Sequence, residues 1–190
     1  MRAGATVFEI DVQVGAPGLV VSHYSRVPRF GNLHRDGWRL RWGQATEPLA
    51  AQLALVPDGA RVLLDLKEAT VAGRERMIAT ISAYTEPARF VASGSHLDDF
   101  AKLRPLGIET WRSIGNPKAL QRVIEDDEVG ADGVTVRHTF LNAALVERLH
   151  AKTPRVIAWT VNERRRAQAL RDMGVDGITT DRPAVMRLLS

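Results

Sequence analysis

The amino-acid sequence predicts an α/β protein in which parallel strands and helices alternate within a single domain, residues 1–190. Short apolar runs alternate with segments of helical periodicity, and charged residues stand near the ends of those runs. A barrel of parallel strands places its functional groups at the carboxyl ends of the strands. The alternative is an open doubly wound sheet, but the sequence has no glycine-rich nucleotide fingerprint and no G-x-S-x-G elbow. The pattern therefore favours the barrel.

The strands are predicted from short apolar runs that are bounded by turn residues. In chain order they cover residues 8–14, 19–22, 62–66, 89–92, 108–111, 133–136, 155–161 and 177–180. Glycines at 107, 130 and 174 stand where helices or turns end.

Helices are predicted between the strands, where apolar residues recur at three- and four-residue spacing. They cover residues 48–56, 74–84, 96–103, 117–125, 141–151, 163–173 and 183–189. Asn162 and Asp181 are placed to cap the last two helices. Residues 24–43 form one long stretch without a regular pattern, and a loop of that length in a compact domain is usually functional or mobile.

The composition limits the class of protein. The chain has 190 residues and a hydrophobic content of 45%, enough for one sizeable core, and it has no cysteine, which excludes disulfides and thiolate metal sites. Basic residues number 26 against 22 acidic ones, but they are scattered, and no nucleic-acid-binding signature accompanies them, so no nucleic-acid partner is expected. No apolar run approaches the roughly 20 residues that span a bilayer, so we expect no stable membrane span and a cytoplasmic location.

Two carboxylates within an apolar run are the most informative feature. Glu9 and Asp11 are two residues apart in the first strand, so both side chains point to the same face. Asp65 and Lys67 repeat this arrangement at the end of a later strand. Carboxylates gathered inside a fold repel one another unless a cation lies among them, which points to a hard, oxygen-liking metal ion. An ordinary amphipathic strand with one face in water explains the same alternation and stays open at this point.

Five segments together resemble the glycerophosphodiester phosphodiesterase family. They are residues 8–12, 19–23, 64–67, 159–162 and 174–183, the last reading Gly-Val-Asp-Gly-Ile-Thr-Thr-Asp-Arg-Pro. Their order and spacing match the family from Gly4 onward. The resemblance implies a TIM (βα)8-type barrel that hydrolyses small-molecule glycerophosphodiesters to glycerol phosphate and an alcohol in lipid metabolism, with Mg²⁺ or Ca²⁺ as cofactor.

The resemblance also implies a role for individual residues. Glu9 and Asp11 match the two metal ligands of the family's first metal-binding strand. Asp65 stands where most members have a third metal-binding glutamate and where the related sphingomyelinase D-like enzymes have aspartate.

Three further residues match the family's substrate pocket. His23 matches its second catalytic histidine, although Tyr24 replaces the aspartate that usually follows. Lys67 matches a lysine that contacts the phosphate, and Trp159 matches a residue that lines the pocket.

The sequence departs from the family before Glu9. Family members begin with a strand ending in His-Arg-Gly and a helix bearing Glu-Asn-Thr, and neither precedes Glu9, since the one His-Arg pair is His34-Arg35. With residues 19–23 taken as the family's hairpin, about seven parallel strands remain, so we expect an incomplete barrel without its first βα unit. An open barrel exposes two strand edges, and an oligomer that covers the seam is a reasonable expectation.

The sequence leaves two functional hypotheses. One is a metal-dependent phosphodiesterase in which His23 protonates the departing alkoxide and Lys67 neutralises phosphate charge. The other is a catalytically impaired domain that binds metal and phosphodiester without turnover, because the family's first histidine has no counterpart. Isolated histidines at 96, 138 and 150 are interpreted as surface or packing residues.

Overall fold

The structure is a computed structural model of the chain. It describes residues 6–15, 18–23, 25–26, 33–36, 39–42, 46–67, 70–84, 86–96, 101–125 and 129–187. Within these ranges no helix combines the length and the apolar character of a membrane-crossing segment.

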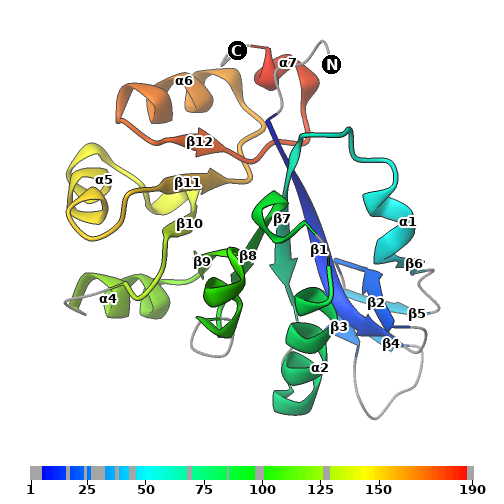
Figure 1. Cartoon of the computed structure of the whole chain (residues 1–190). Coiled ribbons are helices and arrows are strands. Elements are labelled where there is room, and N and C mark those ends of the chain that lie inside the picture. Colours follow the sequence, from blue (N-terminus) through cyan, green and yellow to red (C-terminus); the bar gives the residue numbers. More distant parts are fainter. Residues whose placement is uncertain are drawn as a thin grey trace.

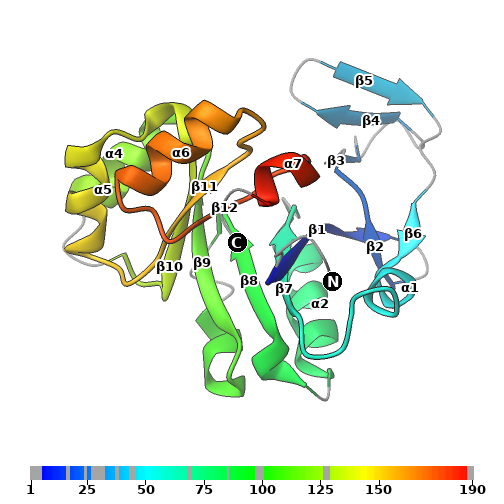
Figure 2. The same ribbon diagram turned by 90° about the horizontal axis from the view of Figure 1, so that it is seen from above.

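A curled nine-stranded sheet organises the fold (Figures 1 and 2). Seven of its strands run parallel in the order β12-β11-β10-β9-β8-β7-β1. Beyond β1, β2 pairs antiparallel with β1, and β6 pairs antiparallel with β2. Their bounds are β1 Val7–Gly15, β2 Gly18–Val21, β6 Glu47–Pro48, β7 Arg61–Leu66, β8 Phe90–Gly94, β9 Glu109–Ile114, β10 Gly133–Arg137, β11 Val156–Trp159 and β12 Gly177–Ile178. The predicted α/β fold with about seven parallel strands is confirmed.

The sheet does not close into a full barrel. Among the described residues, β12 pairs with β11 alone, and the strand order runs from β12 at one edge to β6 at the other. The predicted incomplete barrel is therefore confirmed, and the oligomer expected to cover the seam stays a prediction.

Helices follow most of the parallel strands and cover the outside of the curl (Figure 2). Their bounds are α1 Leu49–Leu53, α2 Val71–Ser82, α4 Pro117–Glu125, α5 Ala143–His150, α6 Arg164–Asp172 and α7 Pro183–Met186, with 3-10 turns at Pro87–Arg89, Ala101–Leu106 and His138–Phe140. Asn142 caps α5 because its side-chain oxygen accepts from the backbone N–H of Leu145 at 2.9 Å.

Two local predictions were wrong, and a third is tested only in part. Residues 97–100 of the predicted helix 96–103 lie outside the described residues, and residues 101–103 belong to the 3-10 turn Ala101–Leu106. Asn162 and Asp181 do not cap α6 and α7, whose N-cap residues are Glu163 and Arg182 without side-chain cap bonds. The long stretch 24–43 is not wholly irregular either.

Residues 24–43 contain a small antiparallel sheet of their own. Its strands are β3 Ser25–Arg26, β4 Leu33–Asp36 and β5 Arg39–Trp42, in the order β3-β4-β5. Figure 2 shows this sheet projecting beside the end of β2. The remaining residues of the stretch lie outside the described ranges.

The two faces of the main sheet differ because side chains alternate along each strand. On the outer face, Val12, Leu64 and their neighbours pack under α2, whose Met77 and Ile81 are fully buried. On the inner face, a layer formed by Leu63, Val91, Trp111 and Ile157 fills the middle of the curl. Two residues further along the strands, towards their carboxyl ends, the inward-facing side chains are polar, and these polar side chains line a pocket.

Candidate metal and phosphate site

Register between β1 and β7 brings the predicted carboxylates together. Asp11 lies directly opposite Asp65, and Glu9 lies opposite Leu63 on the same inward face. One carboxylate oxygen from each of Glu9, Asp11 and Asp65 lies within 4.8 Å of the other two. Because the odd-numbered positions of both strands point inward, the three oxygens face a common space.

Two basic side chains flank the carboxylates. The Lys67 ammonium donates to Asp65 Oδ2 at 2.5 Å and lies 3.2 Å from Asp11 Oδ1. On the other side, His23 Nδ1 lies 2.7 Å from Asp11 Oδ2. Asp11 is thus held between an ammonium and an imidazole, while no hydrogen bond or ion pair within the described ranges engages Glu9.

Crowding of like charges perturbs the acids. Burial, together with the neighbouring Asp11 and Asp65 charges, raises the pKa of Glu9 to about 7, although Lys67 and His23 oppose the rise. Burial also raises the pKa of Asp65, against the lowering effect of Lys67. Part of the Glu9 surface still reaches solvent, so its proton exchanges readily with the medium.

Lys67 stays charged in this setting. Burial by itself would lower the pKa of Lys67, but the adjacent carboxylates of Asp65 and Asp11 hold it above its usual range. The ammonium is a permanent internal cation beside the three acids.

The three carboxylates suit a hard divalent cation. Oxygen ligands in this number and proximity are the donor set that Mg²⁺ and Ca²⁺ take. When ionised, the three carboxylates carry more negative charge than the single ammonium of Lys67 neutralises. Glu9, Asp11 and Asp65 would hold the ion, with the rest of its coordination sphere open to water or substrate oxygens.

A cavity of about 340 Å³ opens above this cluster. One side of the cavity is lined by the three carboxylates, His23 and Lys67, and Leu63 lies at its floor. The other side is lined by residues in or directly after β8, β10, β11 and β12, namely Ser93, Thr135, Trp159, Thr160, Thr179 and Asp181. The Ser93 and Thr135 hydroxyls are buried 3.4 Å apart. The pocket therefore has a charged half and a half rich in hydroxyl groups.

Asn162 fixes the second half of the pocket. Its Nδ2 donates to Asp181 Oδ2 at 3.0 Å, and its Oδ1 accepts from Thr180 Oγ1 and from the Asp181 backbone N–H, each at 3.0 Å. These bonds tie the segment after β11 to the segment after β12. Asn162 therefore braces two pocket walls in place of the predicted helix cap.

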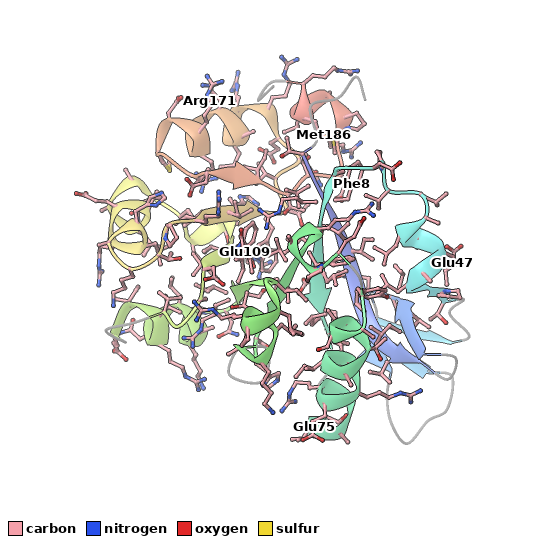
Figure 3. All side chains as sticks on the ribbon, viewed as in Figure 1. Phe8, Glu47, Glu75, Glu109, Arg171 and Met186 are labelled. Atoms are coloured by element: carbon pink, nitrogen blue, oxygen red, sulfur yellow. The ribbon has the colours of Figure 1, made fainter. Side chains whose placement is uncertain are left out.

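A second hollow lies at the amino-terminal ends of the strands. It measures about 600 Å³ and is lined in part by Arg104, Glu109 and Asp132. Its charges are already matched, since Arg104 pairs with Asp132 at 2.9 Å and Arg61 pairs with Glu109, labelled in Figure 3, at 3.0 Å. The smaller pocket, with its surplus of carboxylates, is the better candidate for chemistry.

Comparisons with known proteins point to one family. The model of the glycerophosphoryl diester phosphodiesterase family matches residues 116–185. The Bacillus subtilis protein YhdW, provisionally named a glycerophosphodiester phosphodiesterase, is 42% identical over 53 residues, which are 28% of this chain and 22% of YhdW. The predicted resemblance to this family is confirmed over residues 116–185.

Solved structures of the family have the same fold over nearly the whole chain. A provisionally named glycerophosphoryl diester phosphodiesterase from Silicibacter pomeroyi superposes with a TM-score of 0.75 at 22% identity, covering 98% of this chain and 83% of its own. A phosphodiesterase from Oleispira antarctica, solved with its product sn-glycerol-3-phosphate, superposes with a TM-score of 0.72 at 17% identity, covering 100% of this chain and 87% of its own. At these identities the likeness establishes the fold.

The structure places all of the predicted site residues in one pocket, since Glu9, Asp11, His23, Asp65, Lys67 and Trp159 all line it. Their individual roles stay predictions. No role is predicted from the sequence for the Thr135 and Thr179 hydroxyls, although both line the pocket and lie, like Asp65, near the end of a strand. A threonine in a strand is too common to be recognised as functional without the register of the neighbouring strands.

Proposed function

We propose that this protein is a metal-dependent phosphodiesterase that hydrolyses glycerophosphodiesters to glycerol phosphate and an alcohol. The observation that supports it is the convergence of Glu9, Asp11 and Asp65 with Lys67 and His23 in one pocket of a glycerophosphodiester phosphodiesterase fold. The glycerol phosphate product bound to the Oleispira antarctica relative is consistent with this substrate class.

Each side chain has a distinct task in this proposal. Hydrolysis adds the elements of water across a P–O bond, so the phosphoryl group gains an oxygen and the departing alkoxide gains a proton. The Lys67 ammonium compensates the negative charge that develops on the phosphoryl oxygens, and protonated His23 delivers the proton to the alkoxide. A divalent ion held by the three carboxylates would polarise the phosphoryl oxygens when bound.

Asp11 prepares His23 for this role. A carboxylate oxygen 2.7 Å from Nδ1 favours the tautomer in which that nitrogen carries a proton, and it leaves Nε2 available to the substrate. The imidazole is still 58% exposed, so a leaving alcohol can reach it from the solvent side.

The test is hydrolysis of glycerophosphocholine with Mg²⁺ or Ca²⁺, measured as release of glycerol phosphate. Asp65→Asn should reduce kcat/KM by about a hundredfold or more, because it weakens a metal ligand and the partner of Lys67. Asp58→Asn, an exposed change outside the pocket, is the matched control and should keep full activity. Equal activity in both variants would contradict the proposed site.

A second function is favoured by one observation. Among the described residues that line the pocket, His23 is the single imidazole, and no second histidine stands ready to accept a proton from an attacking hydroxyl. A domain that binds metal and phosphodiester without turnover would have this composition. Calorimetric titration with Ca²⁺ and then with glycerophosphocholine distinguishes the two functions, since binding without release of glycerol phosphate supports the second.

A further inference from the structure

Arginines gather where the last three parallel strands end. Arg137 is the final residue of β10, Arg164 and Arg165 open α6 directly after β11, and Arg182 follows β12 at the start of α7. All four side chains are exposed. We call Arg137, Arg164, Arg165 and Arg182 the arginine rim.

Hydrogen bonds between the three strand-end segments bring the rim together beside the pocket. Arg137 lies in register with Trp159, which lines the pocket. The Arg166 guanidinium, which follows the rim arginines in α6, donates to the His138 and Leu141 carbonyls and so fastens α6 to the segment after β10. The Asn162–Asp181 bonds fasten the segment that leads into α6 to the segment that bears Arg182. Figures 1 and 2 show α6 and α7 side by side.

The positive charge of the rim is not neutralised by ion pairs within the described part of the chain. None of its four guanidinium groups forms an ion pair in the part of the chain that the structure describes. The carboxylates in the same strand-end segments are Glu163 and Asp181, and Asp181 already accepts from Asn162. With Arg166, five arginines face two carboxylates, so these segments present a positive surface.

The rim also opposes the preference of its own helix. Arg164 and Arg165 occupy the first turn of α6, and that turn contains no acidic residue. The macrodipole at a helix N-terminus favours negative charge and not positive charge. Residues that work against local stability while staying exposed are better explained by binding to something outside the chain than by folding.

We propose that the arginine rim docks this protein onto an anionic lipid bilayer, with the mouth of the pocket turned towards the membrane surface. Clustered arginines are attracted by the negative potential of acidic lipid headgroups over about a Debye length. An apolar side chain on the same strand-end side of the sheet favours lipid over a purely polyanionic partner: Val71, at the start of α2, is 61% exposed. The proposal is independent of turnover, because it concerns the surface around the pocket and not the acids within it.

Cosedimentation with vesicles tests the proposal on the full chain. We expect binding to vesicles of phosphatidylcholine mixed with phosphatidylglycerol, little binding to phosphatidylcholine alone, and loss of binding as salt is raised. The double variant Arg164→Gln, Arg165→Gln should bind the mixed vesicles at least about tenfold more weakly, because each arginine near such a surface contributes about fivefold. Its thermal stability should be unchanged or higher, since the substitutions relieve an unfavourable helix terminus.

The matched control is Arg76→Gln, Arg122→Gln, which removes two exposed arginines from α2 and α4 at positions outside the strand-end segments. This control should bind mixed vesicles as the unaltered protein does. An equal loss in both double variants would overturn the proposal, since it would mean that overall charge and not the rim drives binding. Equal binding to both kinds of vesicle would also overturn it, as would displacement from mixed vesicles by short duplex DNA at a matched phosphate concentration.

Discussion

Replacing Lys67 by methionine should destabilise the metal-free protein in a way that depends on pH. The ammonium lies 2.5 Å from Asp65 Oδ2 and 3.2 Å from Asp11 Oδ1, and its side chain is 31% exposed. At an effective dielectric constant of about 20, the contact with Asp65 corresponds to an attraction of about 7 kcal/mol and the contact with Asp11 to about 5 kcal/mol. Most of that gain is offset by the cost of removing the charges from water.

The net loss of unfolding free energy should be about 2 kcal/mol at pH 8, below the 3–5 kcal/mol typical of a fully buried pair that loses one partner. It should shrink as pH falls towards 4. The pKa of Asp65 is raised in the folded state and rises further without Lys67, so protonation at low pH removes the repulsion that the ammonium had compensated. Millimolar Ca²⁺ at pH 8 should restore part of the loss, because a second cation replaces the missing one.

Urea unfolding followed by circular dichroism measures these changes, with Lys118→Met on the exposed side of α4 as the control. The control should change the midpoint little at any pH. A loss for Lys67→Met that is the same at pH 5 and pH 8, or that Ca²⁺ does not reduce, would show that the side chain matters through packing and not through its charge.

Three further outcomes follow from the same geometry. The pKa of Glu9 is about 7, so calorimetry should show that protons are released when Ca²⁺ binds at pH 6. The affinity for Ca²⁺ should fall by up to about tenfold for each pH unit below 7. An affinity that does not depend on pH would exclude Glu9 as a ligand. His23→Gln should lower kcat for glycerophosphodiester hydrolysis by about 10²–10⁴-fold with Ca²⁺ affinity nearly unchanged, and a parallel loss of Ca²⁺ binding would make His23 a support for Asp11 and not an acid. Asn142→Ala should cost about 1 kcal/mol of stability by removing the α5 cap, with activity retained; unaltered urea unfolding would contradict the cap.

Much of the site could be predicted from the sequence because strand geometry is periodic. Glu9 and Asp11, two residues apart, had to share a face, and Asp65 and Lys67 likewise. Side-chain alternation also separates the inward Leu63 and Asp65 from the outward Leu64. No sequence pattern shows, however, that Asp11 lies directly opposite Asp65, because that register joins strands 54 positions apart and depends on how the whole sheet packs.

The sequence-based predictions fail where side chains form hydrogen bonds to residues far away in the sequence. Asn162 has the residue type and position of a helix cap, but its amide bonds to Asp181, nineteen residues away, so α6 begins one residue later and lacks a side-chain cap. A cap requires only local geometry, whereas this brace requires two strand ends to meet in space. In the same way, the close approach of the Ser93 and Thr135 hydroxyls could be recognised only after β8 and β10 were placed.

The charges of the site show why an internal lysine and an external cation are compatible. Three ionised carboxylates and one ammonium leave a net charge of −2, which a single divalent ion would cancel. Without Lys67 the cluster would attract the ion more strongly but would also repel a phosphodiester once that ion was bound. Lys67 contacts one oxygen of Asp65 and one oxygen of Asp11, and His23 contacts the other oxygen of Asp11. The lysine therefore makes the cluster of three carboxylates neutral when it holds metal, and a neutral cluster can admit a singly charged phosphodiester.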